Sequence, residues 1–280
     1  MAIWDAWIGR SQTREDVITP GLLARFCATF DRSAPPETAP QALHWGLCLP
    51  DAATAQLGPD GHPLRDDSAD SFLPPIPLPR RMWASSSVEF IHPLRVGDAI
   101  RRVSTLEKIS EKSGSTGALV FVDVCHQNFA NGALAIEERQ TLVYRDASST
   151  APTPRPADLP TPPIKDWDWH RALTPSEALL FRYSALTFNS HRIHYDLPYA
   201  RDVEGYRGLV VHGPLMATLL LDLAAAHLGQ NTLRTFSFRG QSPAFVGEPL
   251  HLVGKQDGPT IHLAALGGDG RAVMSAQGAV

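Results

Sequence analysis

Three side chains that could hold or exchange a proton lie within six residues of one another in the segment FRYSALTFNSHRIHYDLPYA, residues 181–200: Asn189, His191 and His194. An unperturbed imidazole titrates at about pH 6.5, so a histidine can act as a general acid or base in neutral solution. A carboxamide binds water but exchanges no proton. The helical periodicity before Asn189 ends where this cluster begins, which is unusual for a purely structural helix. The segment therefore predicts acid/base chemistry carried by a histidine.

A second motif, GYRGLVVHGPLMATLL, introduces a long apolar pattern at helical spacing. Gly213 is expected at the N-terminus of that helix, where free backbone N–H groups and the helix dipole favour negative charge. A glycine there lets a ligand approach the backbone closely. Negative charge that develops on a substrate oxygen would be stabilised there, so Gly213 is a candidate oxyanion donor. His212 is expected to pack at the start of the helix and to border the substrate.

A proline-rich segment divides the chain. Residues 147–170 contain six prolines between Pro152 and Pro163, which excludes a helix or a central strand and favours an extended spacer. The sequence therefore predicts an N-terminal half (1–146), a linker (147–170) and a C-terminal half (171–280).

The two halves share an order of signals, which indicates an internal repeat. Each opens with a Thr-Pro helix start, at Thr19 and Thr174, followed by a second helical run introduced by His and Gly, over 43–58 and 211–229. Each closes with strands joined by tight turns, of which Asn131-Gly132 is the strongest hairpin signal. Each half is predicted to be an α+β unit with an antiparallel sheet. The halves are expected to pack as a pseudo-dimer across one continuous sheet, with the first half forming pocket wall rather than supplying a catalyst.

The motifs FNSHRIHYD and RGLVVHGPL together resemble the MaoC-like (R)-specific enoyl-thioester hydratases and dehydratases. The tandem arrangement and the stretch PRRMWA resemble the branch of type 2 hydroxyacyl-thioester dehydratases and mesaconyl- and itaconyl-CoA hydratases. The resemblance implies a double hotdog fold, two tandem repeats in each of which an antiparallel sheet wraps a central helix. It also implies that His194 is the catalytic histidine and that Gly213 supplies the oxyanion-hole amide.

One position departs from the family. Its catalytic aspartate falls on Asn189, which cannot exchange a proton at any useful pH. A single histidine suffices for the addition of one water, because it can take a proton from the water and return it to the α-carbon on the same face. Asn189 is then expected to hold the attacking water. The pair His191 and His194 lacks a third ligand at a suitable spacing, so no metal and no other cofactor is expected.

The acyl group is suggested by two arginines. Arg192 stands where the family commonly has proline, and a guanidinium there could bind a second carboxylate on the substrate. Arg81 and Trp83 end a long Pro-, Asp- and Gly-rich loop and are further candidates for substrate binding. The expected reaction is hydration of itaconyl-CoA or mesaconyl-C4-CoA to citramalyl-CoA. Alternatively, Arg192 points to solvent or pairs with a CoA phosphate, and Arg81 and Trp83 anchor the loop on the sheet.

Three other functions remain open from the sequence. A fatty-acid-type 3-hydroxyacyl-thioester dehydratase would use the same residues. A hotdog thioesterase usually requires a carboxylate near the helix, which the Asn189–His194 pair does not provide. A non-catalytic acyl-CoA-binding module would explain the asparagine but not the presence of His194 and Gly213.

Composition narrows the partners. The net charge is −4 and no cluster of Lys and Arg stands out, which argues against a nucleic-acid partner. The longest apolar stretch, 215–228, is interrupted by Asp222 and is too short to cross a membrane. The three cysteines have no metal-ligand spacing and are expected to be buried free thiols. The expected partner is an acyl-CoA or acyl-carrier thioester, the expected location is the cytoplasm, and a homo-oligomer is compatible with the sequence.

Overall fold

A computed structural model of the chain describes residues 3–33, 37–66, 68, 70–114, 117–146, 162 and 164–280. The strands are β1 (Ser11–Val17), β2 (Arg80–Phe90), β3 (Ala99–Gly114), β4 (Gly117–Ala130), β5 (Ala133–Arg145), β6 (Trp169–Leu173), β7 (Thr235–Gly240), β8 (Leu250–Asp257), β9 (Thr260–Gly267) and β10 (Ala272–Ala279). The helices are α1 (Pro20–Thr29), α2 (Glu177–Thr187) and α3 (Gly213–Leu228). Short helical turns lie at Asp5–Trp7, Leu43–Gly46, Thr54–Gln56, Arg192–His194 and Tyr199–Val203.

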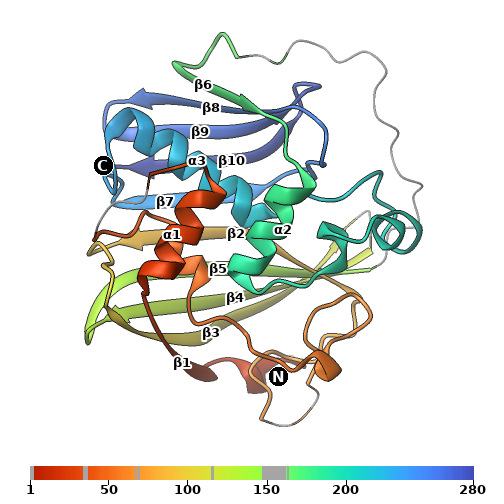
Figure 1. Ribbon diagram of the computed structural model, residues 1–280. Helices are drawn as coiled ribbons and strands as arrows, with labels where there is room; N and C mark the ends of the chain where they lie inside the picture. Colours follow the sequence, from red (N-terminus) through yellow and green to blue (C-terminus); the bar gives the residue numbers. More distant parts are fainter. Residues whose placement is uncertain are drawn as a thin grey trace.

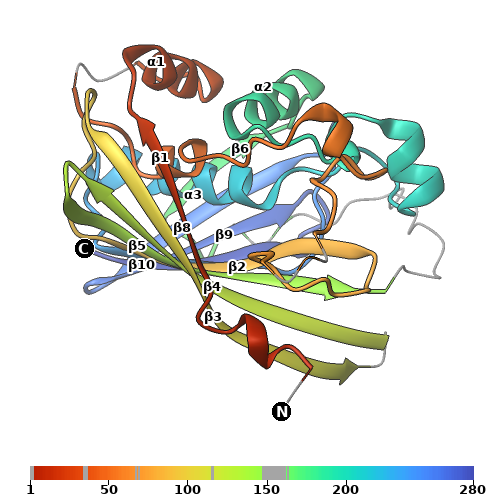
Figure 2. The same cartoon turned by 90° about the horizontal axis from the view of Figure 1, so that it is seen from below.

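All ten strands form one sheet, in the order β1-β3-β4-β5-β2-β7-β10-β9-β8-β6. The sheet curves around α3, and α1 and α2 cover the same side of it (Figure 1). Figure 2 shows α3 lying between the sheet and these two helices. The predicted α+β architecture with antiparallel strands is therefore confirmed.

The two halves meet at the centre of the sheet. Strand β2 pairs with β7 in antiparallel register from Ser85↔Arg239 to Glu89↔Thr235. Counted outwards from this junction, the strands of the first half are β2, β5, β4, β3 and β1, and those of the second are β7, β10, β9, β8 and β6. The two halves thus repeat one connectivity, and the expected continuous sheet is confirmed. Most of the proline-rich segment 147–170 lies outside the described residues, and β6 begins within it at Trp169.

Among the described residues, only those of the second half form a long central helix. From Leu215 to Ala224 every residue of α3 is buried, which makes it the core of the sheet's concave side. The helix predicted over 43–58 is wrong: Leu43–Gly46 is a single 3₁₀ turn. Ala42 and Cys48 on either side of it have φ of 81° and 50°, a left-handed backbone that an α-helix cannot contain. The first half is therefore a hotdog repeat without its central helix.

The helix starts were predicted with mixed success. Thr19 caps α1 as expected, and its Oγ1 accepts a hydrogen bond from the Leu22 N–H at 3.1 Å. In the second half the prediction that Thr174 caps the helix is wrong. Ser176 caps α2, and its Oγ accepts a hydrogen bond from the Leu179 N–H at 3.2 Å. A start at Ser176 also places Glu177 in the first turn, where the helix dipole favours an acid.

The remaining local predictions are confirmed. Asn131 and Gly132 have φ of 50° and 90° and join β4 to β5, as a type I′ turn requires. Cys27, Cys48 and Cys125 are buried and free. Among the described residues, none of the helices combines the length and the apolar character needed to cross a bilayer.

Asp222, the acidic residue within the apolar sequence of α3, links the two halves of the chain through ion pairs. Asp222 is buried and forms ion pairs with Arg32 of the first half and with Arg171 of β6, the latter at 2.6 Å. We expect Asp222→Ala to lower the free energy of unfolding by about 3–5 kcal/mol, because it leaves a buried guanidinium without its carboxylate. Thermal or urea unfolding measures the change, with Asp202→Ala at an exposed position as the control. Equal stabilities of the two variants would contradict this role.

Candidate active site

Local backbone angles and hydrogen bonds set the conformation of the segment after α2. Phe188 ends the helix in the left-handed region, with φ of 48°, and turns the chain back across the helix end. The Asn189 side-chain oxygen then accepts a hydrogen bond from the His191 N–H at 3.0 Å. The short turn Arg192–His194 follows and buries Ile193 and His194. Residues 189–194, which carry the candidate catalytic residues, are called the catalytic loop below.

His194 is held in one tautomer. It is only 7% exposed, and its Nδ1 lies 2.7 Å from the carbonyl oxygen of Val210. A carbonyl oxygen accepts hydrogen bonds only, so Nδ1 carries the proton and Nε2 has the free lone pair. Within the described part of the chain Nε2 has no hydrogen-bond partner. This is the arrangement that a general base requires.

Three further histidines lie beside it. The His212 ring stacks on His194 at 3.5 Å between ring centroids, and His191 meets His194 edge to face at 5.5 Å. His62, from the long loop of the first half, packs against His191 with 4.1 Å between ring centroids and a tilt of 37° between the planes. Burial, together with the charge of neighbouring histidines, lowers the pKa of His194 to about 3 and that of His191 to about 3. Burial and His194 also lower the pKa of His212. The buried imidazoles are therefore neutral at pH 7.

This cluster makes stability depend on pH. His191 and His194 have pKa values of about 3 in the folded state and an ordinary value of 6.5. Between those values the unfolded chain binds more protons than the folded one, so stability is complete above about pH 6.5 and falls as the pH drops. Each histidine contributes up to about 1.4 kcal/mol per pH unit.

We therefore expect the melting temperature to fall steeply from about pH 7 to about pH 5, and the double variant His191→Asn/His194→Gln to show a flatter dependence. Calorimetry over this range measures both slopes. Identical slopes would show that these histidines are not the buried neutral groups.

The start of α3 supplies free donors, as expected for Gly213. The Met216 N–H donates to the His212 carbonyl, and Pro214 has no N–H. The N–H groups of Gly213 and Leu215 have no partner among the described residues. A Cβ on Gly213 would lie 3.8 Å from the carbonyl oxygen of Trp83 in β2, so the first half borders the helix start. The Trp83 indole N–H donates to Ser86 Oγ at 2.9 Å, which fixes the ring.

The two candidate arginines differ in whether their guanidinium groups already have partners within the protein. All three guanidinium nitrogens of Arg192 are engaged by the protein: Nε and Nη2 donate to Asp196, and Nη1 donates to the Pro59 carbonyl. Arg81 is half-buried, has no hydrogen-bond or ion-pair partner among the described residues, and lies close enough for its charge to lower the pKa of His191. The available cation beside the histidines is thus Arg81.

The site contains residues that the sequence did not single out. Asp60, Gly61 and His62 belong to the loop of the first half and contact the catalytic loop directly. Their Asp-Gly-His sequence indicates a turn, but nothing local indicates what that turn contacts.

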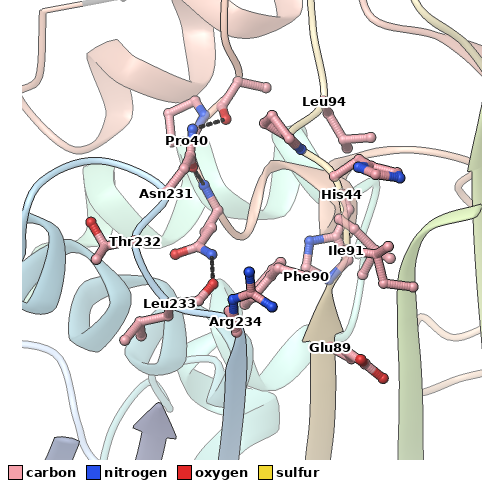
Figure 3. A pocket seen from close by; sticks show the side chains of 15 residues that line it. Pro40, His44, Glu89, Phe90, Ile91, Leu94, Asn231, Thr232, Leu233 and Arg234 are labelled. Carbon is pink, nitrogen blue, oxygen red and sulfur yellow. Dashed lines mark hydrogen bonds between the residues drawn. The ribbon is translucent and has the colours of Figure 1, made fainter. Parts of the chain in front are cut away.

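A cavity lies at the other end of β2. It has a volume of about 350 Å³ and borders Glu89 and Phe90, about 20 Å along the strand from Trp83. Figure 3 shows His44, Asn231 and Arg234 around it. His44 is the counterpart of His212 in the repeat, but it lies within a 3₁₀ turn and no α-helix starts after it. No helix N-terminus of the described chain is among the residues lining this cavity, so it lacks the donors present at Gly213.

Comparison with known proteins identifies the family. The hydroxyacyl-thioester dehydratase type 2 family matches residues 42–246. The chain is 46% identical to a mesaconyl-C(4)-CoA hydratase of Chloroflexus aurantiacus, over 98% of this chain and 97% of that protein. The chain belongs to the hydroxyacyl-thioester dehydratase type 2 family. A mitochondrial hydroxyacyl-thioester dehydratase type 2 of Schizosaccharomyces pombe is 30% identical over 68% of this chain and 71% of its own length.

Solved structures confirm the double hotdog fold. A MaoC-like dehydratase from Phytophthora capsici superposes with a TM-score of 0.72 at 15% identity, covering 100% of this chain and 97% of its own. A Mycobacterium tuberculosis protein described as a double hotdogfold superposes with a TM-score of 0.61 at 12% identity, covering 97% and 95%. As a member of the hydroxyacyl-thioester dehydratase type 2 family the chain is a hydro-lyase acting on a thioester, as its motifs predicted.

Proposed function

We propose that this hydro-lyase hydrates a short dicarboxylic enoyl-CoA, with mesaconyl-C4-CoA as substrate and citramalyl-CoA as product. The observation that carries the proposal is the fixed tautomer of the buried His194, whose ring stacks on His212, the residue before Gly213 at the start of α3. The relative that is 46% identical is named for mesaconyl-C4-CoA hydration, which supports the choice of substrate. Itaconyl-CoA gives the same product and is the second substrate to test. The proposed location is the cytoplasm.

The proposed reaction needs one base. His194 Nε2 takes a proton from water, and the water oxygen bonds to the β-carbon of the enoyl group. The electron pair of the double bond moves towards the thioester, whose oxygen becomes negative and accepts hydrogen bonds from the Gly213 and Leu215 amides. The same Nε2 then returns the proton to the α-carbon. Asn189 holds the water through its amide Nδ2, since its oxygen already accepts from the His191 N–H.

Arg81 is the proposed ligand of the second carboxylate. In mesaconyl-C4-CoA that carboxylate is bonded to the carbon that water attacks, so its counter-charge must lie beside the histidines. A carboxylate left unpaired in a buried site costs several kcal/mol. Arg81 has no competing partner among the described residues, whereas Arg192 is held by Asp196 and Pro59.

We expect Arg81→Leu to lower kcat/KM for mesaconyl-C4-CoA by about 10- to 100-fold, because that ratio corresponds to the free energy of one hydrogen bond to a charged group. The kcat/KM for crotonyl-CoA is expected to change much less. Steady-state kinetics on both substrates measures the change, and Arg192→Leu is the matched control. If Arg192→Leu abolishes the preference and Arg81→Leu keeps it, the sequence-based choice of Arg192 is right after all.

A fatty-acid-type 3-hydroxyacyl-thioester dehydratase is the second candidate. The relative that is 30% identical and the family description favour it. A preference of the wild-type enzyme for unsubstituted enoyl chains would establish it. Release of free thiol would instead indicate a thioesterase, and binding without turnover would indicate a non-catalytic module.

A further inference from the structure

One turn of the first half contacts three successive residues of the catalytic loop. The turn is residues 59–62, closed by a hydrogen bond from the Gly58 N–H to the His62 carbonyl at 2.7 Å. The Asp60 carbonyl accepts from the Arg192 N–H at 2.8 Å, and the Gly61 carbonyl accepts from Ser190 Oγ at 2.6 Å.

The fit between turn and loop leaves no spare space. Gly61 has φ of 86°, and a Cβ added to it would collide with the Ser190 carbonyl oxygen. Only glycine combines that conformation with that approach. The backbone of the turn therefore packs directly against the catalytic loop, and this packing requires glycine at position 61.

The same turn presents a carboxylate–histidine pair. Asp60 Oδ2 lies 2.9 Å from His62 Nδ1, and Asp60 Oδ1 accepts from the His62 N–H at 3.0 Å. Burial alone would raise the pKa of Asp60, but the hydrogen bonds and charge of His62 outweigh it and lower the pKa to about 2. The carboxylate is therefore ionised and holds His62 with its proton on Nδ1.

We propose that Asp60 and His62 are positioning residues for catalysis at His194, and that Asp60 supplies the negative charge that the catalytic loop lost with an asparagine at 189. The pair acts through the His62 ring, which packs against His191, and His191 in turn meets His194 edge to face. When His194 takes the proton from water, a positive charge forms among neighbouring imidazoles. A fixed carboxylate beside the neighbouring His191 ring favours that charge, and the packed rings keep His194 in place.

The charges around these rings support this assignment. The groups that act most strongly on His191 are His62, Asp60, Arg81 and His212, and those that act on His194 are His191 and His62. Asp60 is the one carboxylate in either set. This inference rests on the proposed hydration at His194.

A metal site is the competing explanation. Ligand atoms of Asp60, His62 and His191 lie within 4.8 Å of one another. The two imidazole rings, however, pack against each other, with 4.1 Å between their centroids and 37° between their planes. Asp60 Oδ2 is also already bonded to His62 Nδ1. The geometry is that of a hydrogen-bonded pair.

The first measurement needs no substrate. Nitrogen-15 NMR of the imidazoles is expected to show His62 with its proton on Nδ1 in the wild type. In Asp60→Asn the amide would donate to that nitrogen, so the proton is expected on Nε2. Asp66→Asn removes a charge from an exposed position of the same loop and is expected to leave His62 unchanged. A wild-type proton on Nε2, or no change in Asp60→Asn, would overturn the pairing.

The second measurement is kinetic. We expect Asp60→Asn and His62→Gln each to lower kcat by about 10- to 100-fold, the usual cost of removing the partner that orients a functional histidine, with KM changed much less. The double variant is expected to be no slower than either single one, and Asp60→Glu to recover part of the rate. Unchanged kcat in folded variants would overturn the inference. Loss of activity on chelation, restored by one divalent metal, would overturn it in favour of a metal site. A wild type inactive on every enoyl-CoA would instead refute the proposed function.

Discussion

His194→Ala is expected to lower kcat for hydration by at least ~10²-fold, because general acid/base catalysis contributes about 10²–10⁴. In the proposed reaction one nitrogen, Nε2, both removes the proton of water and returns it to the α-carbon. Asn189 cannot replace it, since a carboxamide does not titrate in the useful range. KM is expected to change much less than kcat, because the proposed donors to the thioester lie at the start of α3 rather than on His194.

The control for this prediction is His170→Ala, an exposed histidine of β6 that hydrogen-bonds to His251. His194→Gln is the second variant to prepare, because its amide retains a donor for the Val210 carbonyl and so preserves folding. Circular dichroism and thermal melting establish that each variant is folded. Near-normal turnover by folded His194→Ala and His194→Gln would refute the mechanism.

Separation of the two halves is expected to abolish activity entirely. A chain of residues 164–280 keeps His194 and Gly213, yet it loses the turn at 59–62 and Arg81. It also exposes the edge of β7, which pairs with β2 over five residues in the whole protein. The unpaired backbone groups of such an edge can pair with another chain and promote aggregation. This fragment is therefore expected to be insoluble or to form oligomers.

The experiment compares the fragment alone with the same fragment co-expressed with residues 3–146. Size-exclusion chromatography and hydration of mesaconyl-C4-CoA are the two measurements. Co-expression is expected to restore a soluble, active complex through the β2–β7 pairing. A soluble, monomeric and fully active 164–280 fragment would show that the first half is dispensable.

The features that the sequence predicted correctly have short-range causes. Asn131-Gly132 specifies its turn through the positive φ of both residues, and Thr19 specifies a helix start through its own side chain. Gly213-Pro214 marks the start of α3 by the same local rules. The catalytic role that the family motifs assign to His194 stays a prediction, and the structure shows only that its Nδ1 is held by the Val210 carbonyl.

The features that the sequence missed depend on contacts distant along the chain. The histidine and glycine that open residues 43–58 look like a helix start, yet left-handed backbone at Ala42 and Cys48 confines the helix to one turn. Arg192 is the arginine nearest to His194 in sequence, but a carbonyl from Pro59 and its own neighbour Asp196 engage its nitrogens. The contact of His62 with His191 is between residues more than a hundred positions apart, and no local sequence pattern indicates it.

The central claim is that His194 hydrates an enoyl-CoA carrying a second carboxylate. The most direct test is kcat/KM of the wild-type enzyme on mesaconyl-C4-CoA and on crotonyl-CoA, with mass-spectrometric identification of the product. The account predicts citramalyl-CoA as product and a kcat/KM for mesaconyl-C4-CoA at least ~10-fold higher than for crotonyl-CoA, the difference expected from one charged hydrogen bond. A preference for crotonyl-CoA or longer unsubstituted chains would contradict it and establish a fatty-acid-type dehydratase instead.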